Sequence, residues 1–198
     1  FNNTTITQWA WDFENDGTMD TTMQNPAHTY NLPGNYTVLL AVQTANGCRD
    51  TITLQVSVFD NPIALFTATT VCQGTATQFT DQSTTTVGVL NQWAWDFDNN
   101  GTTDNVTQNP TYVFPTAGTF LVKLTVTNSF GCIGDTLISV TVNPNPTASF
   151  TAPAVCQGTA TVFTDQSTII GAGNNITTWS WTYGDGMPNG NIQNPTHT

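Results

Sequence analysis

A tryptophan-rich segment that leads into an acidic, glycine-containing turn occurs three times in this chain, and no other feature constrains the fold as strongly. Segment 9–20 (WAWDFENDGTMD) recurs at 93–104 (WAWDFDNNGTTD), an offset of 84 residues from Trp9 to Trp93, and a shorter copy lies at 179–186 (WSWTYGDG). A second segment, 71–77 (VCQGTAT), recurs unchanged at 155–161. A fixed period of this length predicts an array of similar modules.

The repeat divides the chain into three predicted domains. Residues 61–144 form a complete domain, residues 1–60 a domain that lacks its first strands, and residues 145–198 a domain that lacks its last strands. The connectors 59–62 (FDNP) and 143–146 (NPNP) are short and rich in proline. Because proline restricts the backbone, we expect these connectors to join neighbouring domains in a semi-rigid rod.

Within a repeat the hydrophobic period is two. Phe120, Val122, Leu124 and Val126 alternate with a second set of residues, and segments 36–42 and 52–58 follow the same pattern. This alternation indicates strands with one buried and one wetted face. Short strands separated by turns rich in Pro, Gly and Asn predict an all-β fold of tandem β-sandwiches. No segment of ten or more residues has the pattern of an amphipathic helix.

The charge balance excludes several partners. The chain has thirteen acidic residues and only two basic ones, Arg49 and Lys123, so its net charge is −11. Only 8% of the 198 residues are charged. So few cations cannot neutralise a row of phosphates, so we expect neither nucleic-acid binding nor attachment to an anionic membrane. No apolar run of 18 residues exists, so no membrane insertion is expected. The abundance of uncharged polar residues resembles extracellular β-repeat proteins.

The motifs resemble a known module, the PKD domain. They comprise Trp-x-Trp-Asp-Phe before an acidic turn, Gln-Asn-Pro-Ala-His-Thr-Tyr at 24–30, Pro-Gly-Asn-Tyr-Thr-Val at 33–38 and Asn-Gly-Cys at 46–48. The resemblance covers essentially the whole chain. It implies a seven-stranded, immunoglobulin-like sandwich and an extracellular location, and the paired cysteine motifs resemble surface adhesins of Bacteroidota. Phe120 departs from the pattern because it replaces Tyr36 and offers no hydroxyl for a corner hydrogen bond.

The acidic turn is a candidate calcium site. Carboxylate and amide oxygens in one turn are the ligands that calcium prefers, and a cation would relieve their mutual repulsion. The alternative is a solvated turn in which Asp and Asn side chains bond to the nearby backbone. The third repeat has Thr182, Tyr183 and Gly184 at the corresponding positions and is not expected to bind calcium. The candidate ligands are Asp12, Glu14, Asp16 and Asp20 in the first repeat and Asp96, Asp98, Asn100 and Asp104 in the second.

The alternating aromatic residues of the repeated strand share one face. We expect them to fill the sandwich core. The alternative is a stacking platform for surface glycans, which requires an exposed tryptophan in each repeat. The residues are Trp9, Trp11, Phe13, Trp93, Trp95 and Phe97.

The repeat has two cysteine positions, one in an early turn and one in the late hairpin. They are candidates for disulfides in an extracellular chain and are occupied by Cys48, Cys72, Cys132 and Cys156. The strand order that the PKD resemblance implies places Cys72 and Cys132 at opposite ends of a domain, roughly 20 to 30 Å apart. A bridge between neighbouring domains is then easier than an internal Cys72–Cys132 bond. Both alternatives remain open at the level of sequence.

Three Asp-Thr tripeptides resemble the O-glycosylation acceptors of Bacteroidota, although such tripeptides are also frequent in threonine-rich strands. The acceptors would be Thr21, Thr51 and Thr136.

No catalytic pattern is present, because His28 and His197 are the only histidines, occupy one repeated position and give way to Tyr112 in the middle copy. We therefore expect no enzyme activity. The expected function is that of a structural segment in a long extracellular, cell-surface rod or fibre serving adhesion or motility. Its expected partners are neighbouring repeats of the same protein, with self-assembly into filaments and glycan binding as further options. The alternative is a spacer or carbohydrate-binding module of a secreted hydrolase.

Overall fold

The computed structural model describes residues 5–171, 173–187 and 190–198. All regular secondary structure in these ranges is β-strand, joined by turns and irregular segments. The predicted all-β fold of tandem, immunoglobulin-like β-sandwiches is confirmed.

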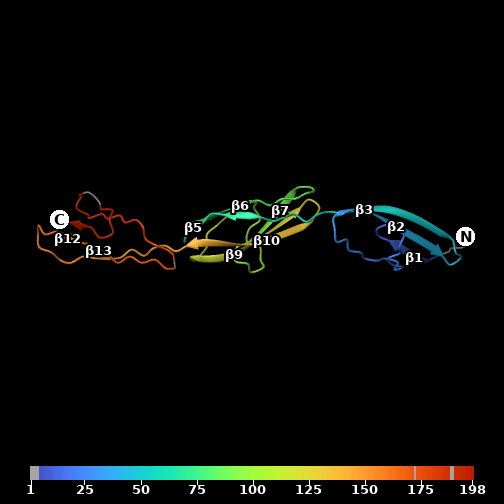
Figure 1. Ribbon diagram of the computed structural model, residues 1–198, viewed down its shortest axis with the longest axis horizontal. Coiled ribbons are helices and arrows are strands. Elements are labelled where there is room, and N and C mark those ends of the chain that lie inside the picture. Colours follow the sequence, from blue (N-terminus) through green and yellow to red (C-terminus); the bar gives the residue numbers. More distant parts are fainter. Residues whose placement is uncertain (1–4, 172, 188–189) are drawn as a thin grey trace. The chain divides into compact units, whose positions relative to one another are not determined.

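The middle repeat contains two sheets. The first has the order β4-β6-β8, with β4 at Phe66–Ala68, β6 at Thr77–Asp81 and β8 at Thr111–Tyr112. The second has the order β5-β10-β9-β7, with β5 at Val71–Cys72, β10 at Ile133–Asn143, β9 at Gly118–Asn128 and β7 at Leu90–Asp96. Strands β5 and β10 are parallel, whereas the pairs within the first sheet are antiparallel. Figure 1 shows β6 in one layer and β9 and β10 in the other.

The core of the middle repeat lies between these sheets. Phe79 and Trp95 are 0% exposed, as are Val122 and Leu124 of β9. Leu121, between the buried positions of β9, is 51% exposed. The predicted period of two is therefore correct, and the side chains that point inward from the two sheets fill one apolar layer.

The first repeat supplies one antiparallel sheet in the order β1-β2-β3 (Figure 1), with β1 at Ile6–Asp12, β2 at Gly34–Thr44 and β3 at Arg49–Val58. These strands are the counterparts of β7, β9 and β10. The register pairs Trp11 with Leu40, and Leu40 with Ile52. Among the described residues, this repeat has no counterpart of the β4-β6-β8 sheet.

The third repeat supplies the other kind of sheet. Strand β11 (Phe150–Thr151) pairs with β13 (Thr164–Asp165), and β12 (Thr161–Val162) pairs with β14 (Thr196–His197). The pair Phe150↔Asp165 reproduces Phe66↔Asp81 of the middle repeat. These strand pairs correspond to the β4-β6-β8 sheet of the middle repeat.

By internal packing the chain divides into two compact units. The first comprises Phe1–Leu65, Ser83–Trp93 and Thr125–Asp135, and the second comprises Phe66–Gln82, Ala94–Leu124 and Thr136–Thr198. The core formed by Phe79, Trp95, Val122 and Leu124 belongs to the second unit.

Candidate functional site

The acidic turn begins where the tryptophan strand ends. Asp12 is the last residue of β1, and Asp96 is the last residue of β7. The turns that follow have the same backbone conformation, with φ of 54° at both Asn15 and Asn99, and Gly17 and Gly101 also have positive φ. Asn and Gly enter this left-handed region more readily than other residues, which explains the Asn-x-Gly spacing in both copies.

The carboxylate at the strand end organises the turn. Asp96 accepts hydrogen bonds from the backbone N–H groups of Asn100, at 3.1 Å, and Gly101, at 2.8 Å. Asp104 accepts the N–H of Phe97 at 2.8 Å and so closes the far side of the turn. Burial raises the pKa of Asp96, but the backbone hydrogen bonds from Gly101 and Asn100 outweigh it, so the net pKa is lowered.

Three carboxylates of each turn converge. Oxygens of Asp12, Glu14 and Asp20 lie within 4.8 Å of one another, and so do oxygens of Asp96, Asp98 and Asp104. A carboxylate oxygen that accepts one N–H keeps a further lone pair, so this donor set fits a hard cation such as calcium. Asp16 lies outside the first group, and the Asn100 side-chain oxygen accepts the N–H of Thr102 at 2.8 Å. The described part of the third repeat holds no such group.

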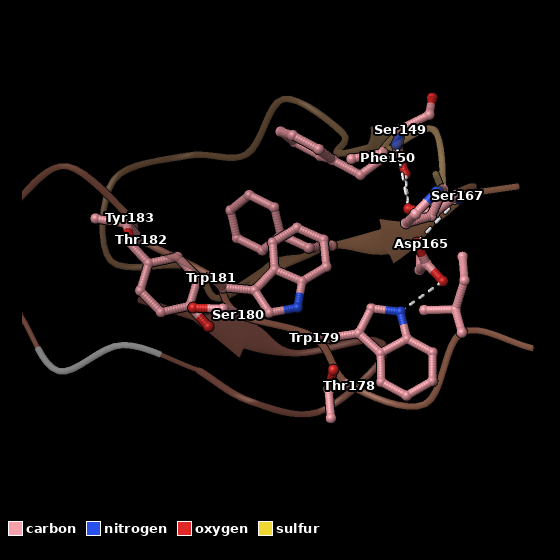
Figure 2. A pocket seen from close by; sticks show the side chains of 14 residues that line it. Ser149, Phe150, Asp165, Ser167, Thr178, Trp179, Ser180, Trp181, Thr182 and Tyr183 are labelled. Atoms are coloured by element: carbon pink, nitrogen blue, oxygen red, sulfur yellow. Dashed lines mark hydrogen bonds between the residues drawn. The ribbon is translucent and has the colours of Figure 1, made fainter. Parts of the chain in front are cut away.

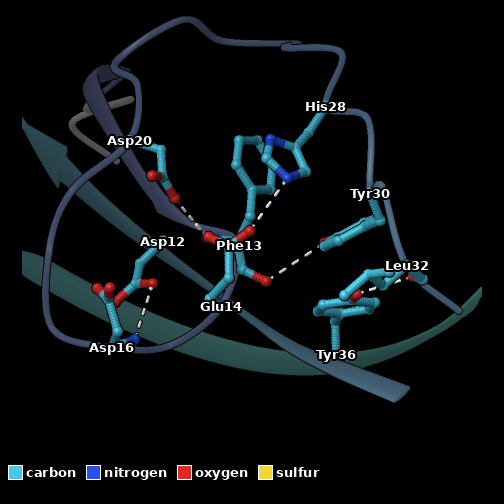
Figure 3. A network of polar contacts seen from close by, with 9 residues as sticks. All are labelled: Asp12, Phe13, Glu14, Asp16, Asp20, His28, Tyr30, Leu32 and Tyr36. Carbon is cyan, nitrogen blue, oxygen red and sulfur yellow. Dashed lines mark hydrogen bonds and ion pairs between the residues drawn. The ribbon is translucent and has the colours of Figure 1, made fainter. Parts of the chain in front are cut away.

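The two acidic turns differ in how their exposed acid is held. In the first repeat His28 Nε2 lies 3.1 Å from a carboxylate oxygen of Glu14 (Figure 3). In the second repeat Asp98 instead accepts a hydrogen bond from the side-chain amide of Asn100, at 3.0 Å. In the first turn the exposed acid Glu14 therefore contacts His28, whereas in the second turn the exposed acid Asp98 contacts Asn100 of the same turn.

Behind each turn the rings form a continuous aromatic column, which the sequence analysis did not predict. In the first repeat His28 stacks on Phe13, with ring centroids 4.2 Å apart, and Tyr30 stacks on Tyr36 at 4.0 Å. The second column runs from Trp95 through Phe97, Tyr112 and Phe114 to Phe120. The signal in the sequence was the alternation of ring-bearing residues at 28 and 30 and at 112 and 114. The position that His28 occupies in the first repeat and Tyr112 in the second therefore contributes a stacked ring to each column.

The tyrosine hydroxyls of the first column bind the backbone. Tyr36 donates a hydrogen bond to the carbonyl of Leu32 at 2.8 Å, and Tyr30 donates one to the carbonyl of Phe13 at 3.3 Å (Figure 3). Desolvation raises the pKa of Tyr30, with a further contribution from the nearby charge of Glu14. Phe120 has no hydroxyl, so the middle repeat lacks this corner bond, as the sequence predicts.

Of the repeated tryptophans, Trp95 is fully buried in the core and the others are half-buried. Trp95 is 0% exposed and donates its Nε1–H to the carbonyl of Thr107 at 2.9 Å. Phe97 is 1% and Phe13 8% exposed, whereas Trp9, Trp11 and Trp93 are half-buried. A sugar platform built on Trp95 is therefore excluded by its burial.

All four cysteines, Cys48, Cys72, Cys132 and Cys156, are free in the structure. The internal Cys72–Cys132 bond is wrong for a geometric reason. Cys72 pairs with Asn143 at one end of β10, whereas Cys132 directly precedes the other end. The eleven residues of β10 separate them by about 30 Å or more, far beyond the reach of a disulfide. A bridge to a neighbouring domain stays a prediction.

The candidate acceptor threonines lie on or beside strands. Thr51 of β3 is exposed, and Thr21 and Thr136 are half-buried. Their glycosylation stays a prediction.

These sheets and turns define a chain of repeated, immunoglobulin-like β-sandwich modules. A family model described as "PKD domain" matches residues 2–58 and again residues 60–142. The chain belongs to the PKD domain family. PKD domains are non-catalytic modules that occur in extracellular or secreted proteins, so this chain has a structural or spacer role.

Several solved structures are similar to the chain. The PKD1 domain of Vibrio anguillarum Epp is 29% identical, covers 44% of this chain and 99% of its own, and has a TM-score of 0.39. The PKD1 domain of the Vibrio cholerae metalloprotease PrtV is 28% identical, with 42% and 98% coverage and a TM-score of 0.37. No curated protein matches the chain. No helix in the described residues is long and apolar enough to cross a membrane.

Proposed function

We propose that this chain is a structural segment of a long extracellular rod or fibre on a bacterial surface, serving adhesion or motility. The proposal rests on the recurrence of one element, an acidic turn above an aromatic core. The carboxylates of this turn form hydrogen bonds with backbone groups of their own repeat. Asp96 and Asp104 fold the turn, and Trp95 fills the core beneath it. Such an element stabilises each module by itself. The number of modules in the array then determines the length of the rod.

The test is surface labelling of intact cells of the source organism with antibodies raised against this chain. The proposal expects labelling without permeabilisation, and weaker attachment or motility after the gene is deleted. Labelling that requires permeabilisation, or unchanged attachment and motility, would refute it. Glycan binding that is lost in the variant Trp9→Ala would instead favour a carbohydrate-binding module.

We also propose that calcium stiffens the first two repeats. The support is the convergence of three carboxylates in each acidic turn, with one buried and two exposed members per group. Calcium would supply positive charge between Asp96, Asp98 and Asp104 and so lower their mutual repulsion. The third repeat, which has Thr182 in place of the strand-end aspartate, serves as an internal control.

A further inference from the structure

The connector between the first and middle repeats runs between two fixed points. Phe59 directly follows Val58, the last residue of β3. At the other end Ile63 and Thr84 exchange backbone hydrogen bonds of 2.9 Å in both directions. Only residues 60–62 lie between, so the contacts of residues 59–62 determine whether this joint can bend.

Phe59 and Asp60 contact two different segments of the middle repeat. The ring of Phe59 stacks on that of Phe130, in the turn between β9 and β10, with centroids 4.0 Å apart and planes inclined by 25°. Cys132 Sγ lies 3.9 Å from the carbonyl oxygen of Phe59. The carboxylate of Asp60 accepts a hydrogen bond from the hydroxyl of Thr86 at 3.1 Å. Because Phe59 is 36% and Phe130 51% exposed, their stack lies outside the sandwich core.

Pro62 lies against the start of β10. It is buried, and a Cβ on Gly134 would overlap its carbonyl oxygen. Glycine at position 134 is therefore required by the close approach of the connector backbone. The first repeat has Asp50 at the position of Gly134 and Asn46 at that of Phe130. The hairpin end of the first repeat thus has neither the space nor the ring that this connector uses.

The second connector differs at the positions that make these contacts. A ring and a carboxylate give way to an amide and a proline, and the hydroxyl that meets the carboxylate gives way to an aliphatic side chain. The side-chain amide of Asn145 instead donates to the carbonyl of Gln73, in the repeat before it, at 3.0 Å. The replacements are Asn143 for Phe59, Pro144 for Asp60 and Ile170 for Thr86.

The backbone beside the two connectors is nevertheless the same. Thr147 and Thr168 exchange backbone hydrogen bonds, as do their counterparts 84 residues earlier. Ser167 Oγ accepts the N–H of Ser149 at 3.2 Å (Figure 2), and the corresponding bond in the middle repeat measures 3.1 Å. The contacts of the first connector therefore come from its own side chains and from those that face it.

We propose that the end of the middle repeat formed by Thr84, Thr86, Phe130 and Gly134 is a binding surface specific for connector 59–62, and that its binding makes this joint stiff. Neighbouring domains move relative to each other unless a specific interface holds them. The first compact unit contains the first repeat together with residues 83–93 and 125–135, which include this surface. The inference deepens the proposed function, because a rod requires joints that resist bending.

The test compares the motion of the two sides of the joint by ¹⁵N relaxation of the full chain. In the wild type, the amides of β3 and those of residues 125–128 should have the same rotational correlation time. In Phe130→Ala, the β3 amides should have the shorter time, because the first repeat then reorients separately. Amide exchange of Ile63 should also become about two- to twelvefold faster, the value expected for loss of one aromatic pair.

Further variants separate the contacts. Phe59→Asn and Thr86→Ile introduce the residues of the second joint and should act in the same direction as Phe130→Ala. Gly134→Ala should have the largest effect, because the added Cβ displaces Pro62. Asn46→Ala, at the counterpart of Phe130 in the first repeat, is the matched control and should change nothing. Unchanged exchange of the β3 and β9 amides checks that each variant is folded.

Two results would overturn the proposal. One is a wild-type chain in which the β3 amides reorient faster than those of residues 125–128. The other is equal correlation times that persist in both Phe130→Ala and Gly134→Ala. These measurements use the purified chain, so their outcome is independent of the labelling and attachment experiments on cells that test the proposed function.

Discussion

Replacing Trp95 with alanine should destabilise the middle repeat severely. The side chain is 0% exposed, and its ring centroid lies 5.0 Å from that of Phe66 and 5.2 Å from that of Phe79. Truncation of a fully buried tryptophan costs about 3 to 5 kcal/mol through lost burial and the cavity left behind. The lost hydrogen bond to the carbonyl of Thr107 adds little, because Thr107 is exposed and its carbonyl can bind water.

Trp181→Ala is a matched control for this prediction. Trp181 has the same type of ring neighbours, with Phe150 at 5.3 Å and Phe163 at 5.6 Å, and it donates its Nε1–H to a backbone carbonyl in the same way. It is only half-buried. The free energy lost should therefore be roughly half as large, about 1.5 to 2.5 kcal/mol.

Amide hydrogen exchange followed by mass spectrometry measures both effects in the full chain. Because each 1.36 kcal/mol changes an equilibrium tenfold, Trp95→Ala should speed exchange of the β9 amides by about two to three and a half orders of magnitude. The β11 and β13 amides report on Trp181→Ala. Equal losses in the two variants, or a loss below about 1 kcal/mol for Trp95→Ala, would refute the assignment of Trp95 to a closed core.

Three further predictions address the turns and the hydrogen bonds. Calcium should raise the melting temperature of the chain and EDTA should reverse this, while Asp98→Asn combined with Asp104→Asn should remove the second repeat's share of the response and leave that of the first repeat; an unchanged melting curve argues against the metal. Tyr36→Phe should lower the stability of the first repeat by about 0.5 to 1.5 kcal/mol through loss of its corner bond, measured by exchange of the β2 amides; no loss would assign that bond no net stability. Hydrogen bonds from Ser167, and further ones from Trp179 and Gln193, lower the pKa of Asp165 to about 2 from 3.8. Its contribution to stability is therefore present above about pH 4 and lost as the pH falls towards 2, and Asp165→Asn should remove that part of an acid titration followed by exchange of the β13 amides.

The strands and turns could be predicted because their causes are local. The alternation through Val122 and Leu124 reflects a side-chain period set by the backbone, and the turn at Gly101 follows from a backbone conformation that glycine tolerates best. Tertiary packing did not need to be known for either. The acidic turn was also predicted as a unit, because Asp96 and Asp104 fold it through hydrogen bonds within nine residues of chain.

The aromatic columns and the fate of the cysteines needed the tertiary structure. His28 stacks on Phe13 from a segment fifteen residues away, and a ring at this position could equally have been a ligand. Cys72 and Cys132 carry identical chemistry, but their distance is set by the length of β10 and the parallel pairing of β5. The sequence by itself thus determined the repeat, its strands and its acidic turns. Only the tertiary structure decided which rings are covered, because burial depends on strands that lie far apart along the chain.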